Sequence, residues 1–135
     1  MAGYAEGVPK RPPPPPLQGL EMAVMEEIWR QGEATVGSVA DAINDVAGTR
    51  RAYTTFLTVM RRLDAKGVAA RERRGKTDYY TAPLTREAYL EARTRTEIDQ
   101  LVASYGDRAL VHFARRIDTL DPDRRAALER LARDD

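Results

Sequence analysis

The chain contains no cysteine and a single histidine, His112. Without cysteine it has no disulfide framework, thiolate metal site or cysteine nucleophile. No apolar run approaches the roughly 20 residues that span a bilayer, and the N-terminus lacks the apolar core of a signal peptide. Glycine-rich phosphate loops, nucleophile elbows and metal-ligand spacings are also missing. We therefore expect a cytoplasmic protein without a membrane partner, which is not an enzyme and carries neither metal nor cofactor.

Charge is informative in its distribution rather than in its total. The formal net charge is only +1. Between Arg50 and Asp78, however, nine lysines and arginines stand against three acidic residues, whereas the balance from Pro83 to the end of the chain is slightly negative. Positive charge gathered on one short segment is typical of a surface that faces phosphate groups.

The first 16 residues should lie outside any core. Glycines and Pro9 are followed by the run Pro12–Pro16, which cannot continue a helix. The run itself should adopt the extended polyproline II conformation, a stiff spacer. We predict a disordered, proline-rich arm over residues 1–16. The length of 135 residues allows one domain, or one small domain plus an appendage.

Three helices are predicted in the first half of the chain. The first spans about Leu17–Gln31, where apolar residues recur on one face, and Gly32 should end it. Thr35 is a suitable N-cap for the second. The third runs from about Ala52 to Lys66 and is closed by Gly67.

The third helix has two contrasting faces. One arc of about 100° collects apolar residues that should face the core: Phe56, Val59, Met60 and Leu63. On or beside the opposite arc, next to Leu57, lie seven hydroxyl-bearing or basic residues: Arg51, Tyr53, Thr54, Thr55, Thr58, Arg61 and Arg62. Because threonine is a poor helix former, three threonines beside arginines on one helix surface indicate a function for that surface.

A short basic hairpin follows directly. Strands are predicted over about Val68–Arg73 and Thr77–Ala82, joined near Gly75. Tyr79 and Tyr80 suit a strand. The hairpin carries a cluster of cations: Arg71, Arg73, Arg74 and Lys76.

The remainder is predicted to be helical, over about 85–105, 107–117 and 122–132, with Asp121 as the N-cap of the last helix. The apolar stripes of these helices are thin, so the helices bury little by themselves. We infer that they pack against a second copy of the chain through the apolar residues of the first two: Leu90, Ile98, Leu101, Val102, Tyr105, Leu110, Phe113 and Ile117.

Three helices followed by a basic hairpin predict a mostly helical fold with one small β-hairpin. Residues 17–84 would form a winged helix-turn-helix DNA-binding domain and residues 85–135 a helical dimerisation domain. The third helix would enter the major groove, where arginine pairs with guanine and threonine offers a hydroxyl and a methyl group. The cations of the hairpin, the wing, would contact phosphate or the neighbouring minor groove.

The sequence also resembles a known family, the penicillinase repressors, which includes the penicillinase, methicillin-resistance and copper-transport repressors. Four segments carry the resemblance: LQGLEMAVMEEIW (17–29), TVGSVADAI (35–43), AYTTFLTVMRRLDAKGVAARERRGKTDYYTAPL (52–84) and LVHFARRI (110–117). The third is the most specific, because it joins a hydroxyl-rich face to the core pattern and the wing.

This resemblance implies a homodimer, held by the C-terminal helices, that represses genes from a palindromic operator in double-stranded DNA. The family's DNA-reading residues carry over to Thr54, Thr55, Thr58 and Arg61, and those of the wing to Arg73, Arg74 and Lys76. Copper-responsive members bind metal through C-terminal cysteines, which this chain lacks. Penicillin-responsive members are cleaved at an Asn-Phe bond, whereas the only asparagine here, Asn44, precedes Asp45. An upstream sensor or protease stays an open partner.

Three alternatives remain beside this interpretation. A small-molecule inducer between the domains would make the chain a ligand-controlled regulator. The winged helix would instead be a protein–protein interaction module if the proline arm docks on a partner. An enzyme would have to use His112 or the acidic residues Asp118, Asp121 and Asp123, which are better explained as a helix junction.

Overall fold

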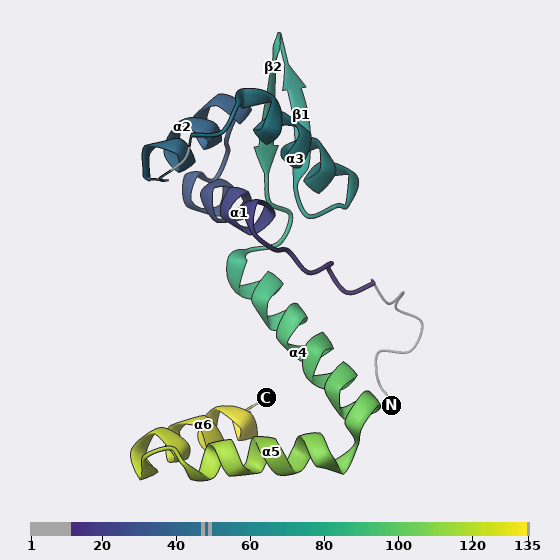
Figure 1. Ribbon diagram of the computed structural model, residues 1–135, viewed down its shortest axis with the longest axis vertical. Coiled ribbons are helices and arrows are strands. Elements are labelled where there is room, and N and C mark those ends of the chain that lie inside the picture. The colour runs from purple at the N-terminus through teal and green to yellow at the C-terminus, as the bar shows by residue number, and fades with distance from the viewer. Residues whose placement is uncertain (1–11, 47, 49, 135) are drawn as a thin grey trace. The chain divides into compact units, whose positions relative to one another are not determined.

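The computed structural model describes residues 12–46, 48 and 50–134. Of the disordered arm expected over residues 1–16, residues 1–11 therefore lie outside the described residues, whereas Pro14 and Pro15 accept hydrogen bonds from Arg93 and Tyr89. Along the described residues the elements follow in this order: α1 (Leu20–Gln31), α2 (Val36–Val46), α3 (Tyr53–Ala65), β1 (Ala70–Arg74), β2 (Thr77–Thr81), α4 (Arg86–Tyr105), α5 (Asp107–Asp118) and α6 (Pro122–Asp134) (Figure 1). This order confirms the prediction of a mostly helical fold with one small hairpin.

Helices α1, α2 and α3 surround a shared apolar core against which the hairpin packs (Figure 1). Fully buried side chains come from every one of these helices and from β2, among them Ile28, Val39, Phe56 and Tyr80. Tyr80 also exchanges two backbone hydrogen bonds with Ala34, at 2.7 and 2.9 Å. These bonds attach the hairpin to the segment between α1 and α2, so the wing is part of the core.

Two element boundaries differ from the sequence prediction, each for a local reason. Helix α1 begins at Leu20 rather than Leu17, because Gly19 takes a φ of 57°, a left-handed conformation that ends the extended segment before it. Strand β1 begins at Ala70 rather than Val68. The amides of Val68 and Ala69 donate to the carbonyl of Leu63 at 3.0 and 3.2 Å and so continue the end of α3.

Side-chain caps that the sequence predicted fix the starts of two helices. The Ser38 amide donates to Thr35 Oγ1 at 3.0 Å and the Thr35 amide donates to Ser38 Oγ at 3.0 Å, a reciprocal capping arrangement at the start of α2. At the start of α6 the Arg124 amide donates to Asp121 Oδ1 at 2.9 Å. Both caps were predicted from the sequence, and their bonds confirm the predictions.

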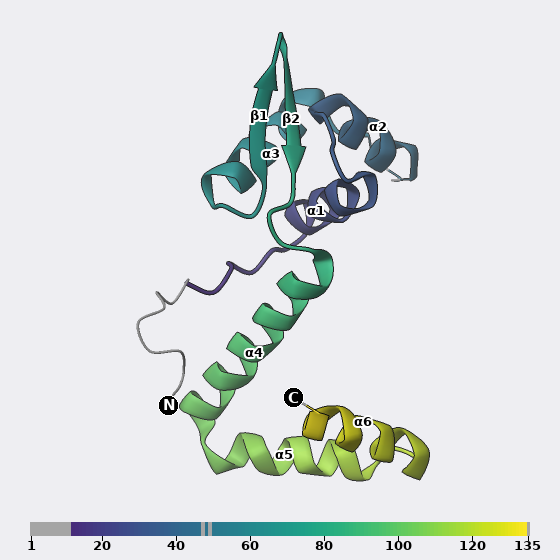
Figure 2. The ribbon, with the colours of Figure 1, turned by 180° about the vertical axis from the view of Figure 1, so that it is seen from behind.

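Strands β1 and β2 pair antiparallel from Ala70–Thr81 to Arg74–Thr77, and Gly75 at the tip takes a φ of 63°. The hairpin extends beyond the three helices, as both views show (Figures 1 and 2). A narrow projecting hairpin with a glycine tip is the wing that the sequence predicted.

The chain divides into two compact units between Thr94 and Arg95, a point inside α4, whereas the sequence led us to expect a domain boundary at residue 84. Tyr89 belongs to the winged-helix core and Leu90 packs against it, so the first half of α4 is part of unit 1. In unit 2, α6 turns back toward α5 (Figure 2), and Arg125 pairs with Asp118 at 3.5 Å.

We predict that Tyr80→Phe stabilises the protein by about 1 kcal/mol, because the Tyr80 hydroxyl is buried without a hydrogen-bond partner among the described residues. Burial also raises the pKa of Tyr80 above its ordinary value of 10.0. The unfolded chain therefore ionises first, and the stability present below pH 10 is lost as the pH rises further.

Urea unfolding at neutral and alkaline pH measures both effects, with Tyr79→Phe as the control on the same strand. The Tyr80→Phe variant should be more stable than the parent chain at neutral pH, and it should lose less stability than the parent chain as the pH rises above 10. A loss of stability in Tyr80→Phe would contradict the assignment of an unsatisfied hydroxyl.

Candidate nucleic-acid interface

Helix α3 is anchored by its apolar face. Phe56, Met60 and Leu63 are completely buried, and Leu57 packs at the edge of the core. The predicted reading residues all lie on the exposed side of the helix or just before it: Arg51, Tyr53, Thr54, Thr55, Thr58, Arg61 and Arg62. One face of α3 is thus buried in the core, and the opposite face presents hydroxyl and guanidinium groups to solvent.

The hydroxyl of Thr58 is already committed as a donor. It donates to the backbone carbonyl of Thr54 at 3.0 Å, one turn earlier. Its oxygen lone pairs and its methyl group remain on the exposed face. Thr58 is therefore suited to accept a hydrogen bond from an amino group on a base edge and to contact a thymine methyl.

Asn44 joins the end of α2 to the segment that leads into α3. Its side-chain amide donates to the Arg51 carbonyl at 3.0 Å and accepts from the Arg51 amide at 3.0 Å. This paired contact sets where α3 begins, two residues later. No sequence pattern predicts this contact, and Asn44 entered the sequence prediction only as a possible cleavage site.

A groove of about 490 Å³ lies beside this contact, lined by residues of α2 and of the segment before α3. Arg50 and Arg51 border it, together with Asn44 and Tyr53. Arg50 was counted in the basic segment but was missing from the predicted DNA-binding residues. Its exposed position next to Arg51 adds it to the candidate interface.

The arginines of the wing are paired within the molecule. Arg71 lies 3.7 Å from both Asp64 and Asp78, and Arg73 lies 3.4 Å from Asp78. Arg74 pairs with Glu33 and stacks 3.7 Å above the ring of Tyr79. The hydrogen bond to Glu33 raises the pKa of the Arg74 guanidinium above its ordinary value.

A different set of cations in unit 1 has no ion-pair partner among residues 12–46, 48 and 50–134: Arg50, Arg51, Arg61, Arg62 and Lys76. Four of the five lie in α3 or directly before it. Within the described part of unit 1, the positive charge that is available to an external anion is therefore concentrated on α3, with Lys76 next to the wing tip.

The predicted dimerisation residues separate into two groups. Leu90 is partly buried against the core of unit 1. Those of unit 2 remain accessible: Tyr105 is 63% and Leu110 49% exposed, Ile98, Leu101 and Ile117 are also exposed, and Val102 and Phe113 are half-buried. Leu128 and Leu131 of α6 are exposed too. Unit 2 thus carries a large apolar surface.

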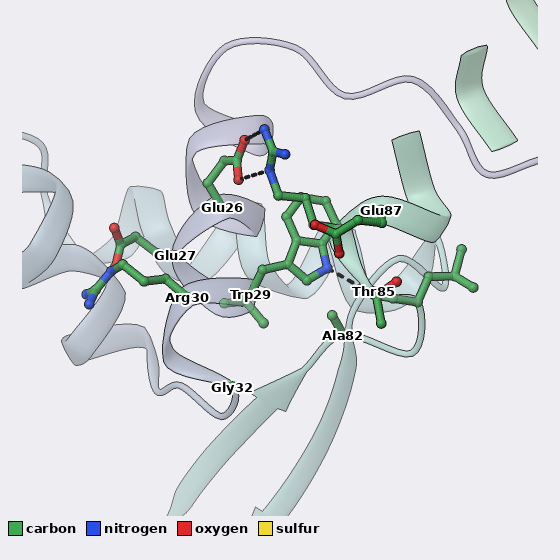
Figure 3. A pocket seen from close by; sticks show the side chains of 11 residues that line it. Glu26, Glu27, Trp29, Arg30, Gly32, Ala82, Thr85 and Glu87 are labelled. Atoms are coloured by element: carbon green, nitrogen blue, oxygen red, sulfur yellow. Dashed lines mark hydrogen bonds and ion pairs between the residues drawn. The ribbon is translucent and has the colours of Figure 1, made fainter. Parts of the chain in front are cut away.

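A second cavity, of about 670 Å³, lies around Trp29 where α1 meets the start of α4 (Figure 3). Four of its charged residues are paired with each other, Glu26 with Arg86 at 2.7 Å and Glu27 with Arg30 at 2.7 Å. The hydrogen bond from Arg30 lowers the pKa of Glu27. The Glu26–Arg86 pair and the indole of Trp29 form the joint between α1 and the start of α4.

Other chemistry has little support within the described part of the chain. No cluster of three or more histidine or acidic residues there is arranged to hold a metal ion. His112 is exposed on α5. None of the described helices is long and apolar enough to cross a membrane.

A helix-turn-helix with an exposed basic third helix and an adjoining hairpin defines the class of winged-helix proteins. Residues 17–134 match the penicillinase repressor family. The chain is also 36% identical, over 118 residues, to the transcriptional regulator BlaI of Mycobacterium tuberculosis, in strains CDC 1551 and H37Rv alike, which covers 84% of this chain and 83% of each relative. The chain belongs to the penicillinase repressor family.

Among solved structures, the chain is similar to the solution structure of the DNA-binding domain of the repressor BlaI. The TM-score is 0.49 and the identity 21%, over 59% of this chain and 94% of that one.

We predict that Asn44→Ala lowers both the stability of the chain and its affinity for DNA. Two backbone groups of Arg51 lose their partners, which should cost about 1–3 kcal/mol of unfolding free energy, and the start of α3 loses its restraint. Urea unfolding and duplex titration measure the two effects. Val46→Ala is the control, because Val46 is 86% exposed in the last turn of α2. Equal behaviour of both variants would show that the contact does not position α3.

Proposed function

We propose that the protein is a dimeric transcriptional repressor that binds a palindromic operator in double-stranded DNA and so blocks promoters. The observation that carries the proposal is the set of cations on and before α3 without ion-pair partners among the described residues: Arg50, Arg51, Arg61 and Arg62. They share an exposed surface with Thr54, Thr55 and Thr58. Membership in the penicillinase repressor family and the name of the relative, a transcriptional regulator, support the same function.

In this proposal α3 enters the major groove and the groove beside Asn44 lies next to the phosphate backbone. Arg61 and Thr58 read base edges, while Arg50 and Arg51 contact phosphates and fix the register. Lys76 at the wing tip adds a phosphate contact. Arg71, Arg73 and Arg74 contribute less, because each must first leave an acidic neighbour in the protein. The protein acts in the cytoplasm, without catalysis and without a metal or cofactor.

The proposal is tested by selecting bound sequences from a random duplex library, followed by a salt titration on the selected duplex. A two-fold symmetric consensus is the expected result. The logarithm of affinity should fall steeply with the logarithm of salt, by about 0.9 per neutralised phosphate. No enrichment over random DNA would reject the proposal and favour a winged helix that binds another protein.

We predict that Arg61→Ala and Lys76→Ala weaken binding in different ways. Arg61→Ala should lower the ratio of specific to random affinity by about fivefold to 100-fold, as the loss of a base contact does. Lys76→Ala should weaken all sequences alike and reduce the salt slope by about 0.9. Arg74→Ala should have a smaller effect than Lys76→Ala because Arg74 is paired with Glu33. Equal losses on specific and random DNA for Arg61→Ala would contradict the division of roles.

The dimer is supported by the exposed apolar residues of unit 2. Soluble monomers rarely leave large contiguous apolar surfaces in water, and the thin stripes of α4, α5 and α6 offer little burial within one chain. A second copy supplies the missing apolar surface. Two winged-helix domains in one dimer then match the two halves of a palindrome.

We predict that Leu101→Asp yields a monomer at concentrations where the parent chain is a dimer, because it places a charge inside the proposed interface. Sedimentation velocity measures this. Ala103→Asp adds the same charge on the same helix, on the side away from Ile98, Leu101 and Tyr105, and should leave the dimer intact. A dimeric Leu101→Asp chain would reject this interface.

A further inference from the structure

The proline run is bound to α4. Tyr89 Oη donates to the carbonyl of Pro15 at 2.7 Å, and Arg93 Nη1 donates to the carbonyl of Pro14 at 3.0 Å. Tyr89 is only 3% exposed, and Pro14 and Pro15 are half-buried. The two donors lie one helical turn apart on α4 and reach two successive carbonyls.

This contact has the chemistry of polyproline recognition. A polyproline II segment makes no internal hydrogen bonds, so its carbonyls are free to accept. Aromatic side chains and directed donors are the usual means of binding it, and its stiffness reduces the entropy lost on binding. The run is also tied at its far end, because Leu17 packs against the core of unit 1. The molecule therefore supplies both the donors and the proline segment that they bind.

The base of α4 is also held at its start. Trp29 Nε1 donates to the Leu84 carbonyl at 2.9 Å, and Arg86 forms a bidentate pair with Glu26 (Figure 3). The rings of Trp29 and Tyr89 lie 5.6 Å apart. The proline run adds a restraint further along the helix, at Arg93, beyond the reach of these contacts.

We propose that residues 12–16 are a strap that fixes the direction in which α4 leaves the winged-helix domain, and that the strap thereby sets the half-site spacing that the dimer accepts. The proposal rests on the proposed function, since it needs a dimer on a two-fold operator. Helix α4 continues unbroken to Tyr105 and carries Ile98 and Leu101 of the proposed dimer interface.

Helix α4 is long enough for a small rotation at its base to change the distance between the two half-sites that the dimer contacts. From Tyr89 to Tyr105 a helix rises roughly 24 Å at about 1.5 Å per residue. A swing of roughly 10° at its base would displace the far end by about 4 Å, which is close to the roughly 3.4 Å between successive base pairs. A strap that removes such a swing would restrict the dimer to one spacing of the half-sites.

Two truncations isolate the strap. Deletion of residues 2–16 removes it, whereas deletion of residues 2–11 keeps it and serves as the matched control, since both remove Lys10 and Arg11 and differ only in uncharged prolines. Each chain is titrated with duplexes that carry two half-sites of the selected consensus separated by spacers of different length, and with a single half-site.

The parent chain and the control should prefer one spacer over its neighbours by about tenfold, and the strapless chain by less than about threefold, a change that corresponds to the loss of at least one hydrogen bond. Tyr89→Phe in the full-length chain, which removes one donor and keeps the ring, should fall between them. Single half-site affinity should be the same for all. An unchanged spacer profile in the strapless chain would overturn the proposal.

Hydrogen exchange on the DNA-free chains separates failure of the strap from failure of the proposed function. Loss of the strap, but not of residues 2–11, should accelerate amide exchange in α4 around Tyr89 and Arg93. If the parent chain selects no symmetric operator, the proposed function fails and exchange alone decides whether residues 12–16 restrain α4. Equal exchange in the two truncated chains would reject the strap itself.

Discussion

The burial of one face of α3 is the constraint on which the rest of this molecule depends. Phe56, Met60 and Leu63 are completely buried against α1, α2 and the hairpin. With these side chains in the core, the rotation of α3 is fixed and its hydroxyl and guanidinium groups must face outward. The wing obeys the same constraint, because Tyr80 of β2 fills that core and ties the hairpin to Ala34. The surface proposed to read DNA is therefore exposed because the opposite face of α3 is packed in the core.

Pairing within the protein, rather than the number of basic residues, distinguishes the cations of the interface. Arg71, Arg73 and Arg74 each have an acidic neighbour, and exposed pairs of this kind contribute about 0–1 kcal/mol. A wing arginine that leaves its acidic neighbour to contact a phosphate therefore gains less free energy than a cation that has no pair to break. The arginines of α3 have no ion-pair partner among the described residues and so give up no such pair when they contact phosphate. This difference moves the electrostatic centre of the proposed DNA contact from the wing to α3.

The sequence predicted those features that repeat along the chain or act between neighbours. The spacing of Phe56, Met60 and Leu63 identified the buried face of α3, and Thr35 and Asp121 marked helix starts that the caps confirm. It did not predict the pairing of Arg74 with Glu33 or the contact of Asn44 with Arg51, because both depend on where separate elements meet. The contact of Pro15 with Tyr89, 74 residues apart, has no periodic or local signal at all.

Helix α4 packs against the winged-helix core at its first turns and exposes apolar residues at its last turns, and its sequence separates the two regions. Its first turns place Tyr89 and Leu90 on the winged-helix core, and its last turns expose Ile98, Leu101 and Tyr105. The polar stretch Arg93–Glu97 lies between them and includes the point where the two units divide. If α4 were apolar along its whole length, no residue would mark where the contact with the winged-helix core ends and the exposed apolar surface begins. The polar middle confines each of these to its own end of the helix. Since the helix is continuous, a restraint at its base, such as the bond from Arg93 to Pro14, bears on whatever its far end assembles with.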